Sequence, residues 1–176
     1  ASLTVTEDDG ISSLGLFTNA SDVDATDTLS ISELTLVSGD ASGIADNGTS
    51  LSVDPSVYND LAVGESTVIS YSYNVIDGNG GVVAQTATIT ITGVNDAPTV
   101  SAAVSSTVTE EDGSYSLNLL TGASDADASD TLGVSSLTLV SGDASGIADN
   151  GTSLSVDPSV YNDLAVGETA VITYSY

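Results

Sequence analysis

The sequence predicts an all-β protein built from tandem Greek-key β-sandwiches. Three observations support this fold class: one sequence repeats along the chain, apolar and polar residues alternate within each copy, and turns rich in glycine and asparagine separate the alternating segments. No segment of useful length has the spacing of an amphipathic helix. Short strands separated by turns over about 100 residues favour a sandwich of seven strands, with a closed barrel as the less favoured alternative.

The repeat indicates the domain organisation. The sequence VTEDDG at residues 5–10 returns as VTEEDG at 108–113, and the later matches keep the same offset of 103 residues. Between residues 1–73 and 104–176, 57 of the 73 aligned pairs are identical. This period is too long for a solenoid, whose units span roughly 20–50 residues, and suits one domain per copy. We therefore expect one domain at 1–98, with a linker to residue 103, and a second at 104–176.

Two late strands are the clearest elements of the first copy. Apolar or aromatic side chains occupy every second position over 69–75 and again over 87–91, with serine, threonine and asparagine between them. A period of two is expected of strands with one buried face. The Asp-Gly-Asn-Gly-Gly sequence at 77–81 supplies the residues that a tight hairpin needs, and Asp-Asn-Gly at 46–48 marks another tight turn.

The second copy of the repeat is shorter than the first. The first copy continues through residues 74–98, and no counterpart of these residues follows Tyr176. Repeat two is therefore expected to lack its last strands, which belong to a continuation of the polypeptide or are supplied by another chain through β-strand addition. The chain has no apolar run of 18 residues and no signal-like N-terminus, so we interpret it as an internal fragment of a larger protein.

The charge of the chain excludes most kinds of function. The chain contains 25 Asp and Glu residues and no Lys, Arg, His or Cys, so its formal net charge is −25 at pH 7. It has no imidazole base, amine or thiol nucleophile, or phosphate clamp, and we expect no enzymatic activity. Nucleic acid and an anionic membrane surface are excluded as partners as well, because attraction to either depends on basic residues. We also expect no membrane insertion.

The same charge predicts that the fold depends on cations. Hydrophobic residues make up 40% of the chain and the mean hydropathy is +0.22, which favours a folded protein over a disordered one. Repulsion among the carboxylates has no internal cation to offset it. Calcium binds roughly 6 to 8 oxygen ligands and suits clustered carboxylates. We therefore expect Ca²⁺ to be the stabilising partner.

Three segments of the first copy resemble the VCBS and cadherin-like repeats of large bacterial surface proteins. They are VTEDDG at 5–10, NASDVDATDTLSI at 19–31 and YSYNVIDGNGGVVAQTATITITGVNDAP at 71–98. The resemblance implies an immunoglobulin-like, cadherin-like sandwich. It also implies a place in the extender region of a secreted RTX-type adhesin, which is extracellular, lies on the bacterial cell surface and takes part in cell adhesion or biofilm formation.

The resemblance also implies where calcium would bind. In cadherins an Asn-Asp linker and an Asp-x-Asp motif of the following domain hold the same ions. The site between the copies would take Glu7, Glu65, Asn95, Asp96, Asp125 and Asp127. A matching half-site on the first copy would take Asp22, Asp24 and Asp77, and the next linker would take Glu110 and Glu168. The chain departs from the cadherin pattern at Gly93, where the first acidic residue of the linker would stand, and lacks one position before Ala97.

Ordinary structural roles are the alternatives to these assignments. The aspartates at 22–27 also suit a solvated turn, Asp77 also suits the start of the turn at 77–81, and Glu65 also suits an exposed turn. A further group, the tyrosines on alternating strand positions, is expected in the core, with an exposed sugar-stacking strip as the alternative. These are Tyr71, Tyr73, Tyr174 and Tyr176.

Two functions remain open at this point. Near identity between copies favours a structural spacer rigidified by calcium at its joints, with calcium ions and the neighbouring repeats of the same polypeptide as its partners. The alternative is an adhesion module that binds a polysaccharide or a like domain on another cell. Saturable binding to a polysaccharide would favour the module, and its absence across a broad panel would favour the spacer.

Overall fold

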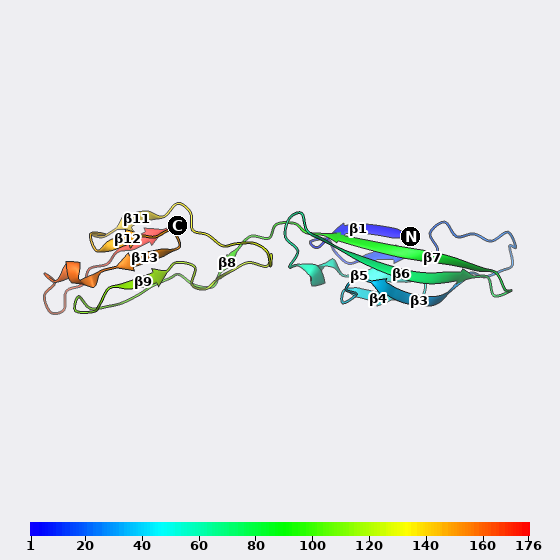
Figure 1. The fold of residues 1–176 in the computed structure, drawn as a ribbon, viewed down its shortest axis with the longest axis horizontal. Coiled ribbons are helices and arrows are strands. Elements are labelled where there is room, and N and C mark those ends of the chain that lie inside the picture. The colour runs from blue at the N-terminus through cyan, green and yellow to red at the C-terminus, as the bar shows by residue number, and fades with distance from the viewer. The chain divides into compact units, whose positions relative to one another are not determined.

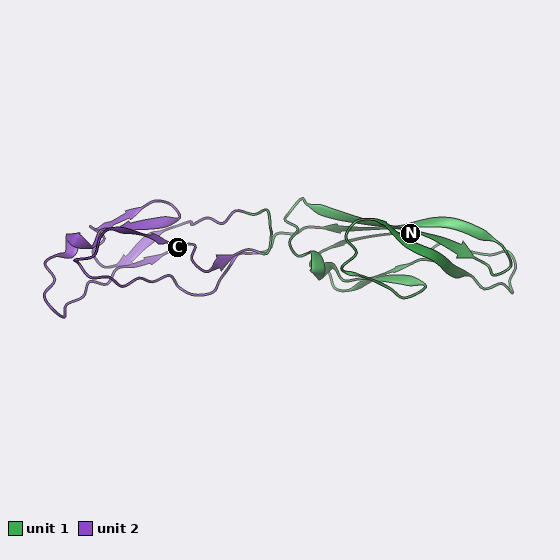
Figure 2. Cartoon of the chain, turned by 60° about the horizontal axis from the view of Figure 1, so that its bottom comes forward, with its two compact units in different colours: residues 1–96, 126–130 green, residues 97–125, 131–176 purple.

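The computed structural model describes residues 1–176 (Figure 1). The chain forms two compact units, which Figure 2 shows in different colours. Unit 1 contains Ala1–Asp96 together with the segment Ala126–Asp130, and unit 2 contains Ala97–Asp125 and Thr131–Tyr176. No helix in the structure is long and apolar enough to span a lipid bilayer.

Unit 1 is a sandwich of two β-sheets, as predicted. The larger sheet has the strand order β1-β7-β6-β3, and the smaller sheet has the order β2-β5-β4. A single 3₁₀ turn, η1 (Pro55–Tyr58), follows β5. The strands are β1 (Ser2–Thr6), β2 (Ser12–Gly15), β3 (Ser30–Ser38), β4 (Ile44–Asp46), β5 (Ser50–Val53), β6 (Ser66–Ile76) and β7 (Val82–Thr92).

The hairpin of β6 and β7 forms the centre of the larger sheet (Figure 1). The two strands pair antiparallel from Ser66 opposite Thr92 to Ile76 opposite Val82, and β1 pairs parallel with the other edge of β7. The inward side chains of Ile69, Ile89 and Ile91 are 0% exposed. The predicted alternation along these strands is therefore confirmed.

The predicted turns are also present. Gly78 and Gly80, between β6 and β7, have φ values of +83° and +109°, which only glycine adopts without strain. Gly48, between β4 and β5, has a φ of +82°, and the backbone N–H of Asn47 donates to the carbonyl oxygen of Ser50 over 2.9 Å. Both glycine-containing turns thus join neighbouring antiparallel strands, as the sequence indicated.

Apolar side chains from both sheets meet in one core, which includes two buried tyrosines. The Tyr73 hydroxyl donates to the carbonyl oxygen of Leu16 over 2.8 Å, and the Tyr58 hydroxyl donates to that of Asp40 over 2.8 Å. Burial raises the pKa of both phenols. Tyr71 packs against the same core, so the core interpretation of Tyr71 and Tyr73 is confirmed.

Unit 2 repeats part of this arrangement. A three-stranded sheet has the order β12-β13-β9, which corresponds to β4-β5-β2, while β11 pairs with β14 as β3 pairs with β6. A third pair joins β8 to β10, and the 3₁₀ turn η2 (Pro158–Tyr161) follows β13. The strands are β8 (Thr99–Val100), β9 (Tyr115–Asn118), β10 (Ala123–Ser124), β11 (Thr138–Ser141), β12 (Ile147–Asp149), β13 (Ser153–Val156) and β14 (Thr173–Ser175).

Gly93 follows β7 at a point of close backbone approach. Its N–H donates to the carbonyl oxygen of Glu65 over 3.0 Å. A Cβ atom at this position would fall far inside van der Waals contact with the carbonyl oxygens of Leu61 and Ala62. The position that resembles the first acidic residue of a cadherin linker therefore has no room for a side chain in this chain.

We expect Gly93→Ala to lower the free energy of unfolding of unit 1 by about 1–3 kcal/mol, the usual cost of forcing an extra group into a packed site. Backbone atoms cannot move aside as the end of a flexible side chain does. Urea unfolding followed by circular dichroism measures the change. Gly10→Ala is the matched control, because nothing lies within 4 Å of a Cβ there. Equal effects of the two substitutions would show that a clash with backbone atoms at residue 93 is not the cause of the destabilisation.

Candidate metal sites of unit 1

Glu7 is a buried carboxylate just beyond β1. Its backbone N–H donates to the carbonyl oxygen of Thr92 over 3.2 Å, which continues the pairing of β1 with β7 by one residue. Strand alternation turns Glu7 to the same inward side as Val5, and its side chain is 1% exposed. Oε1 accepts a hydrogen bond from the N–H of Val94, whereas the buried Oε2 has no hydrogen-bond partner.

Asp96 connects two further polar side chains to the stretch that follows β7. Its N–H donates to Oδ2 of Asp127 over 3.0 Å, and its own Oδ2 accepts a hydrogen bond from Nδ2 of Asn59 over 2.7 Å. Asp127 is 2% exposed. Glu7 and Asp127 are thus held by amides two residues apart, those of Val94 and Asp96. We call Glu7, Asn59, Asp96 and Asp127 the linker cluster.

A backbone contact holds the segment that carries Asp127. The N–H of Ala128 donates to the carbonyl oxygen of Asp60 over 3.1 Å. The segment Ala126–Asp130 thereby belongs to unit 1, although it lies in the second copy of the sequence. Its counterpart in the first copy is exposed at Asp24. Nearly the same sequence therefore places one aspartate in a buried cluster and the other at the surface.

The electrostatics of the linker cluster are those of an anionic site without a protein cation. Glu7 and Asp127 are the two buried charged residues of the chain, which contains no Lys, Arg or His. The terminal amine of Ala1 is bonded elsewhere, to the carbonyl oxygen of Thr86 over 2.8 Å. Burying a carboxylate is costly unless a cation or hydrogen bonds compensate it. The oxygen-only donor set of the cluster suits a hard cation such as Ca²⁺.

Five other residues predicted for linkers lie outside this cluster, and one of them, Glu168, is exposed in unit 2 and accepts a hydrogen bond from the N–H of Ala165 over 2.9 Å. Glu65 is exposed, and its Oε2 accepts a hydrogen bond from the N–H of Ala62 over 3.1 Å. Asn95 is exposed, and its side chain donates to the carbonyl oxygen of Asp96 over 2.6 Å. Asp125 and Glu110 belong to unit 2 and are half-buried there. Their assignment as calcium ligands stays a prediction.

A second acidic group lies beside the β6–β7 hairpin. Carboxylate oxygens of Asp22, Asp27 and Asp77 all lie within 4.8 Å of one another, and we call these three residues the hairpin cluster. The sequence pattern pointed to Asp24 in place of Asp27. Asp24 instead donates its N–H to Oδ1 of Asp22 over 2.9 Å and accepts a hydrogen bond at its carbonyl oxygen from the N–H of Asp27 over 3.0 Å. Asp24 therefore shapes the loop that carries Asp22 and Asp27.

Hydrogen bonds from the hairpin backbone hold Asp77. Oδ1 accepts from the N–H of Asn79 over 2.7 Å and from that of Gly81 over 2.9 Å. These bonds lower the pKa of the Asp77 carboxyl, and the bond from Asn79 has the largest effect. The Asn79 side chain donates to Oδ2 of Asp27 over 2.9 Å, which links the two loops. The hairpin cluster is therefore preorganised around the Asp77 carboxylate, but most of its oxygens already accept hydrogen bonds.

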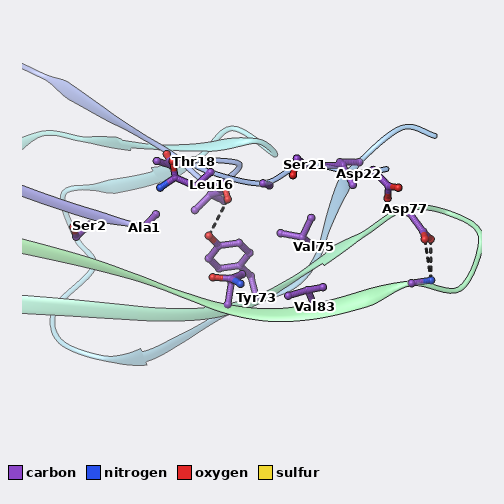
Figure 3. A pocket seen from close by; sticks show the side chains of 15 residues that line it. Ala1, Ser2, Leu16, Thr18, Ser21, Asp22, Tyr73, Val75, Asp77 and Val83 are labelled. Atoms are coloured by element: carbon purple, nitrogen blue, oxygen red, sulfur yellow. Dashed lines mark hydrogen bonds between the residues drawn. The ribbon is translucent and has the colours of Figure 1, made fainter. Parts of the chain in front are cut away.

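A cavity of about 720 Å³ opens beside the hairpin cluster (Figure 3). Leu16, Tyr73 and Val75 line its inner part, and Asp22 and Asp77 lie at its outer end. The dashed bond from Tyr73 to Leu16 shows that the one aromatic hydroxyl there is already satisfied within the protein. Nothing in this cavity pairs a nucleophile with a base, so nothing here points to catalysis.

Asn59 and Asp60 were not among the residues singled out as ligands, whereas Asp27 was considered only with Asp22 and Asp24, as part of the aspartate-rich segment at 22–27. Asn59 and Asp60 follow η1, where Pro-Ser-Val-Tyr-Asn-Asp recurs in both copies. Their roles depend on contacts with Asp96 and Ala128, far along the chain. Only the recurrence of the motif was visible in the sequence, and recurrence alone does not separate a structural turn from a site.

Comparison with known protein families supports the fold class that the strands indicate. The model of one family, described as the cadherin-like domain, matches residues 1–92 and 94–172. None of the curated proteins compared with the chain matches it. Cadherin-like domains are typically extracellular, non-enzymatic modules of adhesion or structure, and they generally bind calcium. With both repeats matched, the chain belongs to the cadherin-like domain family.

Proposed function

We propose that the chain is part of a calcium-rigidified spacer of a secreted bacterial surface adhesin, of the VCBS and RTX kind. One observation carries the proposal: Glu7, a member of the linker cluster, is buried with one carboxylate oxygen unpartnered, in a chain that has no cationic side chain. The residues present suit calcium, which would bring its charge to the carboxylates of Glu7, Asp96 and Asp127.

Calcium at the linker cluster would tie together parts of the chain that are distant in sequence. Glu7 precedes β2, Asp96 follows β7, and Asp127 comes from the second copy. A cation shared by such segments stabilises the folded state because the unfolded chain does not bring them together. The hairpin cluster is a proposed second site, with Asp27 beside the predicted Asp22 and Asp77.

The repeat and the charge support a spacer over a special binding domain. The two copies share 57 of 73 aligned residues, including an unbroken identical stretch from Leu34 to Glu65. A spacer needs many equivalent units, and we propose that each copy with its linker is one domain of such an array. A net charge of −25 suits a calcium-containing environment outside the cell, where divalent cations offset the repulsion. Adhesion and biofilm formation are the processes that such a spacer would serve.

The test compares Asp127→Asn with Asp24→Asn. The two aspartates are counterparts in the repeat, but Asp127 is buried in the linker cluster and Asp24 is exposed. Isothermal titration of the full chain with Ca²⁺ should show affinity at one site weakened by at least about tenfold in Asp127→Asn, because ligand charge sets calcium affinity. Asp24→Asn should keep that site. Equal titrations for both variants and the parent would contradict calcium binding at the linker cluster.

A second measurement separates the spacer from an adhesion module. The full chain in calcium is incubated with a broad panel of immobilised polysaccharides, and bound protein is measured against concentration. A spacer shows no saturable binding to any of them. Saturable binding to one polysaccharide would overturn the spacer function while leaving the calcium titration unaffected.

A further inference from the structure

The turn between β4 and β5 exposes an asparagine that is followed by a glycine. Asn47 and Gly48 are both exposed, and nothing lies within 4 Å of the place that a Cβ atom of Gly48 would take. A backbone nitrogen beside a residue without a side chain is the least hindered nucleophile that a peptide offers. The turn therefore exposes both groups of an intramolecular acyl transfer, the side-chain amide of Asn47 and the backbone nitrogen of Gly48.

A carboxylate already holds the proton of this backbone nitrogen. The N–H of Gly48 donates to Oδ1 of Asp46 over 2.7 Å. A general base must lie within about 2.6–3.2 Å of the atom whose proton it takes, and Asp46 meets this condition. Unit 2 repeats the contact, since the N–H of Gly151 donates to Oδ1 of Asp149 over 2.7 Å. The sequence Asp-Asn-Gly therefore positions a base at the same nitrogen in both units.

We propose that Asn47 is a site of self-modification, at which the side-chain amide becomes a carboxylate without an enzyme. The nitrogen of Gly48 attacks Cγ of Asn47, and Asp46 accepts the proton of that nitrogen as the N–Cγ bond closes a succinimide ring. The Cγ–Nδ2 bond then breaks, and Nδ2 takes the proton from Asp46 and leaves as ammonia. Water opens the ring at either carbonyl carbon, which gives aspartate or isoaspartate at position 47. The reaction involves neither the linker cluster nor the hairpin cluster.

Hydrogen bonds of the asparagine side chain set the rate at each Asn-Gly sequence. The side-chain amide of Asn150 donates to Oγ of Ser155 over 2.7 Å, and that of Asn79 donates to Oδ2 of Asp27 over 2.9 Å. No such bond restrains the side chain of Asn47. The side chain must turn its carbonyl carbon toward the backbone nitrogen, so each of these bonds slows the reaction. Asn47 is therefore the fastest of the three sites.

The test compares residues 47 and 150, because the sequence from Leu34 to Glu65 recurs unchanged from Leu137 to Glu168. The folded full chain is incubated at neutral pH in water enriched in heavy oxygen. A glutamate-specific protease then releases residues 34–65 and 112–168, and mass spectrometry measures the label at each asparagine. Residue 47 should react about two- to tenfold faster than residue 150, the range that one hydrogen bond supplies. In urea the two rates should be equal.

Two kinds of variant test the roles of the neighbours. Asp46→Ala should slow the reaction at residue 47 by at least about tenfold and leave residue 150 unchanged, because it removes the general base. Asp149→Ala is the matched control and should do the reverse. Ser155→Ala should raise the rate at residue 150 to that at residue 47. Circular dichroism checks that each variant is folded.

Defined results would overturn the proposal. An unchanged rate at residue 47 in folded Asp46→Ala would exclude Asp46 as the base. An unlabelled residue 47 in the folded parent, or a rate at residue 150 equal to or above it, would exclude the self-modification of Asn47 as described. If Asp46→Ala does not fold, Ser155→Ala decides alone, and an unchanged rate at residue 150 in that variant refutes the proposal.

Discussion

Removing calcium is expected to lower the melting temperature of unit 1 by about 10–20 °C. Binding to the native state alone stabilises it by about 2.7 kcal/mol when free calcium is 100 times the Kd of one site. For a domain of about 100 residues, each kcal/mol shifts the melting temperature by about 4–8 °C. Differential scanning calorimetry in calcium and in excess EDTA, at fixed ionic strength, measures the shift. Magnesium should replace calcium poorly, because it prefers a tight octahedral shell and keeps its waters.

The variant Glu7→Gln separates specific binding from general screening of charge. It retains the size of the side chain and removes the buried charge, so we expect it to lose most of the calcium-dependent part of the melting temperature. In EDTA it should melt no lower than the parent, because the uncompensated carboxylate is gone. Its matched control is Glu110→Gln, at the counterpart position in unit 2. A calcium response that survives intact in Glu7→Gln would exclude Glu7 as a ligand.

The two units are expected to unfold in separate steps, with unit 1 the more stable. The core of unit 1 contains twelve buried residues and that of unit 2 contains three. Leu51→Ala should lower the free energy of unfolding of unit 1 by about 2–5 kcal/mol, the range for deleting a fully buried leucine side chain. In the calorimeter only the upper transition should move.

Leu154→Ala is the matched substitution, because Leu154 stands in the same sequence within unit 2 and is 5% exposed, against 0% for Leu51. It should move only the lower transition, and by less, since looser surroundings collapse more readily around a deleted side chain. A single transition that both variants shift equally would show that the chain unfolds as one cooperative unit.

The strands of unit 1 were predictable because their burial is periodic. Over 69–75 and 87–91 every second side chain faces the core, and glycines with positive φ end the segments at the expected turns. The turn η1 was not predicted, since four residues give no helical period. Unit 2 shows the limit of local sequence: residues 104–109 nearly repeat those of β1, yet they form no strand where no partner lies beside them.

The candidate sites were predicted only in part, for a related reason. Glu7, Asp96 and Asp127 belong to motifs with recognisable patterns, and hydrogen bonds connect Glu7 and Asp127 to the residues that follow β7, while their role as calcium ligands stays a prediction. Asn59 enters through a hydrogen bond to a residue 37 positions away, which no local pattern reveals. In the hairpin cluster, Asp27 lies with Asp22 and Asp77 because Asp24 is used by the turn itself. Patterns identify the motif, whereas loop conformation decides which of its carboxylates converge.

The segment Ala126–Asp130 lies in the second copy of the sequence but belongs to unit 1. This arrangement limits the ways in which the gene that encodes the chain can change in length. The first copy contains both Asp60 and Asp96, which bind this segment, and residues 23–27, its own counterpart of the segment. Recombination that adds or deletes whole copies of 103 residues therefore recreates every joint with the same partners, without compensating substitutions. Recombination that adds or removes only part of a repeat would separate Asp127 from Asp96 and leave Glu7 buried in an incomplete linker cluster. Length variants that survive selection should accordingly differ by whole multiples of the repeat, and sequencing the gene across strains would reveal any that do not.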